Sequence, residues 1–367
     1  MWLKTIFSFI VAHLFLFGTT SPKVSTIPVS TSSTPIVSAI ATTSTKIATS
    51  TPLKTKIVAK IAVKPVSKTI ETNQSTSTPN TYVEPTYDFE LINTFARKAI
   101  VNILCTAKGG ELSPISGTGI IINPNGLILT NAHIAEYFLL RDFRQKDFLE
   151  CVIRTGSPAY PKYNAEIVYI SPTWVEDNKS LLKEAVQKGT GENDFAFLRI
   201  VSAINGSDLP QTFSYIPMNV SEIINKNEPV LLASYAAGFL GGLSILQNLS
   251  IATAVTNVQD YFTFKQSTID LLSVGGTIVS QKGSSGGAVV DSGATVIGMI
   301  STSSDGNTTS NRELNAITSA YINRSLQNEL GMTLLEFENQ DIAKFAKKFQ
   351  EINVPNLTKL ITDELSK

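Results

Sequence analysis

Hydrophobic and polar positions follow four different patterns along the 367-residue chain, with changes near residues 18, 87 and 331. The first pattern is a basic start at Lys4 followed by an apolar stretch over residues 6–17. This stretch is shorter than the roughly 20 apolar residues that cross a bilayer. Residues 1–18 are therefore predicted to be a secretory signal peptide. A short membrane anchor stays open as the alternative, because no A-x-A cleavage site follows.

The second pattern, in residues 19–87, is dominated by Ser, Thr, Pro, Lys and Val. No Gly, Phe, Trp or Tyr occurs between Thr19 and Thr81. A segment without aromatic side chains buries too little apolar surface to offset the entropy lost on folding. We expect a disordered, mildly basic linker that serves as an extended stalk.

The third pattern consists of short apolar runs separated by turn residues. A first series covers residues 99–106, 117–122, 127–130, 150–154, 165–170 and 195–200, and a second covers 230–233, 246–258, 277–280, 288–290 and 296–301. A strong turn signal at 123–126 and a helical insert at 179–188 interrupt the first series. Regularly spaced short strands of this kind predict an all-β barrel or sandwich. The fourth pattern, helical periodicity over 320–330 and 333–365, predicts C-terminal helices.

Composition removes several classes of function. Thirty basic and thirty acidic residues cancel, so no electrostatic footprint for nucleic acid or an anionic membrane exists. Two histidines and two cysteines, with Cys105 and Cys151 far apart, do not have the paired spacing of a zinc site. We therefore expect no metal and no cofactor. Because His13 lies in the apolar N-terminal stretch, His133 is the one imidazole of the folded part and the first candidate for a general base.

Three segments carry residues suited to nucleophilic catalysis. His133 follows a predicted strand, Asp194 precedes another, and Ser285 lies in the glycine-rich run Gly283-Ser284-Ser285-Gly286-Gly287. Each has an ordinary structural reading by itself: a histidine at a strand end, a turn, and a flexible loop. The three residues become informative together because of their order: His133 and Asp194 fall in the first strand series, and Ser285 falls in the second.

That arrangement resembles the chymotrypsin-like serine endopeptidases, and in particular their bacterial HtrA/Deg-like branch. The resemblance covers roughly residues 90–330. The matching segments are Ser116–Ile122 leading to Leu127–His133, then Asp194–Leu198, Gly283–Val290 and Val296–Ser301.

The resemblance implies a fold of two six-stranded antiparallel β-barrels with C-terminal helices behind a disordered N-terminal stalk. We expect the N-terminal barrel at 88–205, the C-terminal barrel at 206–331 and a helical tail at 332–367. It also implies a triad of His133, Asp194 and Ser285, in which His133 acts as base for Ser285 and Asp194 orients His133. The backbone N–H groups of Gly283 and Ser285 are expected to form the oxyanion hole.

The resemblance further implies a substrate pocket and a pair of cysteines. The pocket is expected at Val279, Ser280, Ser301, Thr302 and Ser303, with Val279 at its base. Without an acidic residue there, cleavage after small or medium aliphatic residues is predicted. Cys105 and Cys151 fall on strands that are neighbours in the family's barrel, so a disulfide is one reading and two buried thiols the other.

Two departures from the family limit what is expected. The residue before the nucleophile is Ser284 rather than an acid, which argues against activation by insertion of a new N-terminus. About 37 residues follow Leu330, too few for a PDZ domain.

The sequence thus predicts an exported serine endopeptidase acting on polypeptides, secreted, periplasmic or at the cell surface, with a possible N-terminal membrane tether. The alternative is a catalytically inactive trypsin-fold binding protein displayed on a stalk. The oligomeric state is left open.

Overall fold

A computed structural model describes residues 88–108, 112–184, 189–238, 240–264, 267–303 and 313–367. The predicted signal segment and stalk, residues 1–87, lie outside the described residues. Among the residues that are described, no helix is both long and apolar enough to cross a membrane.

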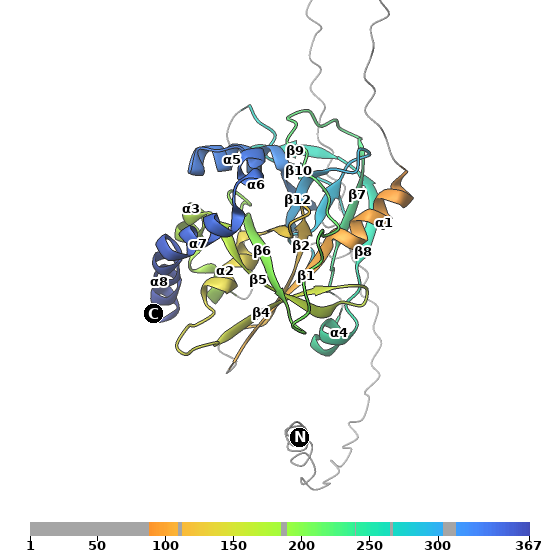
Figure 1. The fold of residues 1–367 in the computed structure, drawn as a ribbon. Coiled ribbons are helices and arrows are strands. Elements are labelled where there is room, and N and C mark those ends of the chain that lie inside the picture. The colour runs from red at the N-terminus through yellow and green to blue at the C-terminus, as the bar shows by residue number, and fades with distance from the viewer. Residues whose placement is uncertain (1–87, 109–111, 185–188, 239, 265–266, 304–312) are drawn as a thin grey trace, which may run out of the picture. The chain divides into compact units, whose positions relative to one another are not determined.

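The described chain begins with a helix that the strand pattern did not predict, α1 (Phe89–Ala99) (Figure 1). The side chain of Asp88 caps it by accepting the N–H of Glu90, and an apolar stripe including Ile92 and Ala96 is buried. The helix ends where a run of β-branched residues starts at Ile100, because such residues favour strand over helix.

The first half of the fold is a closed six-stranded barrel in the order β1-β2-β3-β6-β5-β4. Its strands are β1 (Ile100–Ala107), β2 (Ile115–Ile121), β3 (Leu127–Thr130), β4 (Leu149–Thr155), β5 (Tyr160–Ile170) and β6 (Ala196–Ala203). All neighbours are antiparallel, and the barrel interior is filled by Ile, Leu, Val and Phe. The predicted N-terminal barrel has the expected strands.

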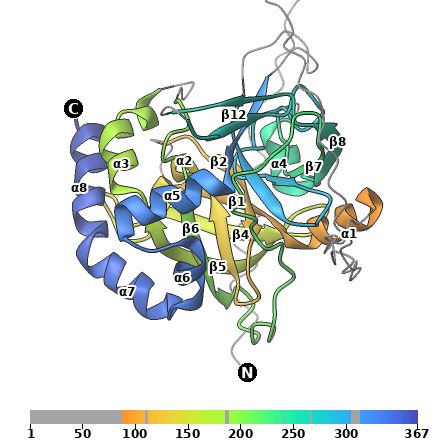
Figure 2. The same cartoon turned by 90° about the horizontal axis from the view of Figure 1, so that it is seen from above.

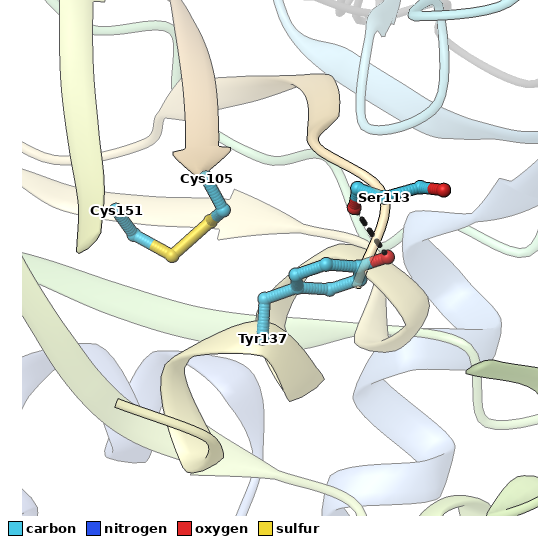
Figure 3. Close-up of a disulfide and its surroundings, with 4 residues drawn as sticks. All are labelled: Cys105, Ser113, Tyr137 and Cys151. Carbon is cyan, nitrogen blue, oxygen red and sulfur yellow. Dashed lines mark hydrogen bonds between the residues drawn. A yellow bond between two sulfur atoms is a disulfide. The ribbon is translucent and has the colours of Figure 1, made fainter. Parts of the chain in front are cut away.

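Cys105 on β1 lies directly opposite Cys151 on β4, and the two are bonded, with Cα atoms 4.0 Å apart (Figure 3). Closing a loop of 46 residues restricts the unfolded chain and stabilises the fold by about 4 kcal/mol in the chain-entropy account. Figure 3 also shows Tyr137, whose hydroxyl donates to the Ser113 carbonyl near this end of the barrel.

Short helices interrupt the first barrel. They are α2 (Ala132–Leu139), α3 (Pro172–Asn178) and a single 3₁₀ turn, η1 (Leu181–Lys183). Of the helical insert predicted at 179–188, the described part contains only the 3₁₀ turn, and residues 185–188 lie outside the described residues. Ser171 caps α3 by accepting the Trp174 N–H, and Pro172 occupies the first turn, where its missing N–H costs nothing.

The second half is a seven-stranded antiparallel sheet in the order β8-β7-β11-β12-β13-β10-β9, where a closed six-stranded barrel was expected. The strands are β7 (Pro229–Ser234), β8 (Ala252–Asn257), β9 (Asp260–Phe262), β10 (Leu271–Ser273), β11 (Ala288–Val290), β12 (Val296–Ser303) and β13 (Leu314–Thr318). The edge strands β8 and β9 follow one another in the chain with two residues between them, so the sheet curls back on itself without closing into a barrel.

Two predicted strands of this half differ in the structure. The run 246–258 starts inside helix α4 (Gly242–Gln247), and only its last part forms β8. The run 277–280 is a turn: the Ser280 N–H donates to the Thr277 carbonyl, and the Ser280 hydroxyl accepts the Thr277 N–H. β-Branched residues favoured a strand there, but these local side-chain bonds compete successfully with pairing.

Four helices complete the chain as the tail pattern predicted. They are α5 (Ser319–Leu330), α6 (Leu334–Asn339), α7 (Ile342–Ile352) and α8 (Val354–Leu365). A capping box between Thr333 and Glu336 starts α6, and Gly331, in a left-handed conformation, ends α5. Helix α7 lies against β5 of the first barrel, and α8 lies beside α3 (Figure 2). Phe337 of α6 packs on Phe197 of β6, with ring centroids 4.8 Å apart.

Candidate active site

His133 and Asp194 meet because the strands that lead to them are paired. β3 and β6 are antiparallel with Thr130 opposite Ala196, so the end of one strand lies beside the start of the other. His133 lies three residues after Thr130, in the first turn of α2, and Asp194 lies two residues before β6 begins. His133 was predicted at a strand end, and in the structure helix α2 begins there.

The carboxylate of Asp194 holds His133 at two points, one on the imidazole and one on the main chain. His133 Nδ1 lies 2.9 Å from Asp194 Oδ2, and the His133 main-chain N–H donates to Oδ1 at 3.0 Å. The hydroxyl of Ser301 also donates to Oδ2, at 2.8 Å. Because Nδ1 carries the proton that faces the carboxylate, Nε2 is left as a proton acceptor.

Asn131, the residue before α2, contributes to the same network. Its Nδ2 donates to the Asp194 main-chain carbonyl at 2.9 Å rather than capping the helix. A helix start without a side-chain cap commonly costs about 1 kcal/mol. Asn131 therefore fixes the Asp194 backbone instead of capping the helix.

Ser285 lies on the glycine-rich turn that leads into β11. Thr118 on β2 ties this turn to the first barrel: its N–H donates to the Ser285 carbonyl at 2.8 Å, and its hydroxyl donates to the Gly283 carbonyl at 2.8 Å. The Ser285 hydroxyl donates to the Ser301 carbonyl at 3.4 Å. Within the described residues, Ser285 makes no hydrogen bond to His133.

The glycines of this turn are required by its backbone. Gly283 and Gly286 have φ of +89° and +84°, in the region that favours glycine. A Cβ on Gly286 would lie 1.8 Å from the Thr118 carbonyl oxygen, and one on Gly283 would lie 2.7 Å from the Tyr235 carbonyl oxygen. The N–H groups of Gly283 and Ser285 have no hydrogen-bond partner in the part of the chain that the structure describes, which leaves them available to an oxyanion.

The predicted pocket residues divide into two groups. Val279 and Ser280 are fully buried, Val279 within the apolar cluster of the second sheet, while Ile278 beside them is 59% exposed. Ser301, Thr302 and Ser303 lie on β12, with the Thr302 and Ser303 backbone paired to β13 only. Ser284 is buried, and its hydroxyl contacts the Val279 carbonyl.

Glu136, one turn after His133 on α2, was missed by the sequence analysis. Its side chain is fully buried, and neither carboxylate oxygen has a hydrogen-bond partner among the described residues. Burial first, and then the negative charge of Asp194, raise the pKa of Glu136 well above its usual value. An unpaired buried carboxylate is costly, so the protonated form is favoured beside the His133–Asp194 pair.

Outside the region of His133, Asp194 and Ser285, the described structure offers weaker support for a functional site. Among the residues described, no group of three His, Cys, Asp or Glu side chains could hold a metal ion. A cavity of about 920 Å³ lies among the C-terminal helices and is lined by Tyr169, Glu329, Lys344, Lys348 and Phe349, among others. No residue of the triad lines it.

Comparison with known proteins identifies the class. Residues 117–299 match the trypsin-like peptidase domain family, a span that includes His133, Asp194 and Ser285. The chain therefore carries a trypsin-like peptidase domain of the chymotrypsin fold, as the sequence resemblance predicted. No curated protein sequence matches it. Among solved structures it is similar to a serine endoprotease from Yersinia pestis, with 16% identity over 68% of each chain and a TM-score of 0.42.

We expect Glu136→Gln to stabilise the fold in a pH-dependent way. Below the ordinary glutamate pKa, folded and unfolded chains are both protonated, so variant and wild type should be equally stable. As the pH rises, the unfolded chain releases its proton before the folded chain does, and the wild type loses stability until the raised pKa is passed. In that window the variant should gain about 1.4 kcal/mol per pH unit over wild type.

Urea denaturation at several pH values measures this difference. The matched control is Glu150→Gln, which makes the same substitution at an exposed glutamate on β4. A pH-independent difference between wild type and Glu136→Gln would contradict the raised pKa.

Proposed function

We propose that the chain is a serine endopeptidase that cleaves polypeptides with Ser285 as nucleophile, His133 as general base and Asp194 as the group that orients His133. The observation that carries the proposal is the contact of His133 Nδ1 with the Asp194 carboxylate at 2.9 Å, in a domain whose nucleophile turn is bonded to the same barrel through Thr118. The trypsin-like peptidase match supports the same class.

In the proposed mechanism the Ser285 hydroxyl leaves the Ser301 carbonyl and donates to His133 Nε2. Hydrogen bonds of this kind are often long or misaligned until substrate binds. Ser285 Oγ then attacks the scissile carbonyl carbon as His133 takes the proton, and the imidazolium is stabilised by Asp194. The Gly283 and Ser285 N–H groups receive the developing oxyanion, each worth roughly 3 kcal/mol in comparable sites. His133 passes its proton to the leaving amine, and water completes the cycle through the acyl-enzyme.

The competing proposal is a binding protein that has kept the fold without the activity. The contacts to Asp194 favour the enzyme. This carboxylate accepts hydrogen bonds from Ser301, from the His133 main chain and from the imidazole. Burying it costs desolvation free energy, and a binding protein has no need to retain such a group.

We propose cleavage after small or medium aliphatic residues such as Val, Ala, Ile or Leu. Val279, Ser280 and Ile278 bring no charge to the predicted pocket, so a buried Arg or Lys of the substrate would find no counter-ion there. Among the described residues, the main chain of Thr302 and Ser303 pairs with β13 on one side and with no strand on the other, which supports pairing of that side with an extended substrate.

Export and surface display are further proposals. The apolar segment at residues 6–17 supports a signal peptide or short anchor, and residues 19–87 have the composition of a stalk. The Cys105–Cys151 bond also supports an exported protein, because disulfides persist in oxidising compartments.

The nucleophile is tested by Ser285→Ala. This change should lower peptide hydrolysis roughly a millionfold, because the members of a triad act as a unit. Circular dichroism and thermal unfolding should stay those of the wild type, since the lost hydroxyl makes one long hydrogen bond. Ser284→Ala is the matched control. Loss of activity in that variant with retention in Ser285→Ala would shift the nucleophile by one position.

Specificity is tested by profiling the wild type on a peptide library. Cleavage after aliphatic residues should exceed cleavage after Arg or Lys by on the order of tenfold to a hundredfold, since an apolar pocket gains from each buried methylene and cannot pair a cation. A dominant preference for Arg or Lys, absent from the Ser285→Ala preparation, would sink the aliphatic assignment and leave the nucleophile untouched.

A further inference from the structure

The residue before Asp194 has an unusual backbone. Asn193 has φ of +56°, in the left-handed region that residues other than glycine seldom occupy. Here the turn is closed by the Asp194 N–H, which donates to the Gly191 carbonyl at 3.1 Å, and by the Phe195 N–H, which donates to the Asn193 carbonyl at 2.8 Å. The position of the Asp194 carboxylate therefore depends on how firmly Asn193 is held.

Helix α5 holds Asn193 through three hydrogen bonds. The Tyr321 hydroxyl accepts the Asn193 main-chain N–H at 3.1 Å and donates to Asn193 Oδ1 at 2.9 Å. The Ser325 hydroxyl donates to the same Oδ1 at 2.8 Å. Tyr321 and Ser325 are four residues apart and so share one face of the helix. Both the backbone and the side chain of Asn193 are thus fixed from outside its own turn.

The Tyr321 hydroxyl is itself held in place. Its ring packs edge-on against Phe264 with centroids 4.9 Å apart, and burial raises the pKa of the hydroxyl, so it keeps the proton that it donates. Thr318 caps α5 by accepting the Tyr321 N–H at 3.0 Å, which fixes this residue at the start of the helix.

Helix α5 follows β13 of the second sheet, whereas Asn193 belongs to the turn that leads into β6 of the first barrel. Ser301, which donates to Asp194 Oδ2, also comes from the second sheet. The second half of the fold therefore forms hydrogen bonds to the Asp194 turn at two separate places: at the carboxylate, and at the residue before it.

We propose that Tyr321 and Ser325 are positioning residues for the triad, acting through Asn193 to set the Asp194 carboxylate against His133. This inference rests on the proposed function. Without the hydroxyl of Tyr321, the Asn193 N–H loses its acceptor and the left-handed turn loses most of its support. Asp194 then shifts relative to the imidazole, while the substrate-binding surface is unchanged.

The test compares Tyr321→Phe and Ser325→Ala with a matched control, Tyr261→Phe. Tyr261 also donates its hydroxyl to a protein oxygen, the Ile224 carbonyl at 2.8 Å, but it lies in the second sheet and contacts no triad residue. Tyr321→Phe should lower kcat by about tenfold to a hundredfold with KM unchanged, the loss typical of a misplaced catalytic group. Ser325→Ala should cause a smaller loss, and Tyr261→Phe none.

A second readout does not depend on activity. The His133 Nδ1 proton, hydrogen-bonded to Asp194, should give a low-field proton NMR signal that Asp194→Asn assigns. In Tyr321→Phe this signal should weaken or move, and in Tyr261→Phe it should match the wild type. Thermal unfolding checks that each variant is folded, and Ser325→Ala decides the question if Tyr321→Phe does not fold.

The two failures are distinguishable. An active wild type whose kcat and His133 signal survive both Tyr321→Phe and Ser325→Ala would overturn the inference and leave the proposed function standing. A wild type without Ser285-dependent hydrolysis would overturn the proposed function, and the NMR signal alone would then decide the inference: a shift specific to Tyr321→Phe supports it, and an unshifted signal overturns it.

Discussion

The proposed active site depends first on Thr118, through which the turn that carries Ser285 is fixed to the barrel that carries His133. Its N–H and hydroxyl donate to the Ser285 and Gly283 carbonyls, and the same hydroxyl accepts the Tyr235 N–H at 3.0 Å. Its own carbonyl accepts the hydroxyl of Thr130, three residues before His133. Buried polar groups of this kind cost about 1–3 kcal/mol each when left unpaired. The position of Ser285 relative to His133 is therefore set by a chain of hydrogen bonds between the barrel and the second sheet.

Hydrogen bonds from both halves of the fold likewise fix the position of Asp194. A buried carboxylate is stable only when its oxygens are hydrogen-bonded, and the donors here come from both halves of the fold, His133 from the first and Ser301 from the second. Separation of the two halves would remove the Ser301 donor from Asp194 and break the bonds of Thr118 to the turn that carries Ser285. Polar contacts, and not a shared apolar core alone, therefore set the position of the second sheet relative to the barrel at this site.

Much of this arrangement could be predicted from the sequence. Ten of the strand runs were visible because short apolar segments alternate with turn residues, and the glycine-rich run around Ser285 marks a backbone that only glycine tolerates at 283 and 286. Helix α2 was missed because its start, Ala132–His133, continues an apolar strand without a capping side chain; Asn131 bonds Asp194 instead. β9, β10 and β13 were missed, and the first two are only three residues long. The roles of Thr118, Ser301 and Tyr321 depend on contacts between residues more than 100 positions apart, which a single sequence does not show.

The central claim is that Ser285 is an activated nucleophile, and covalent labelling tests it most directly. A fluorophosphonate reacts with a serine hydroxyl only when a base removes its proton during attack. Mass spectrometry of the labelled chain should find one adduct, on the peptide that contains Ser285, and none in Ser285→Ala or in a His133→Ala variant. An unlabelled wild type that is folded, or an adduct that persists after Ser285→Ala, would contradict the account.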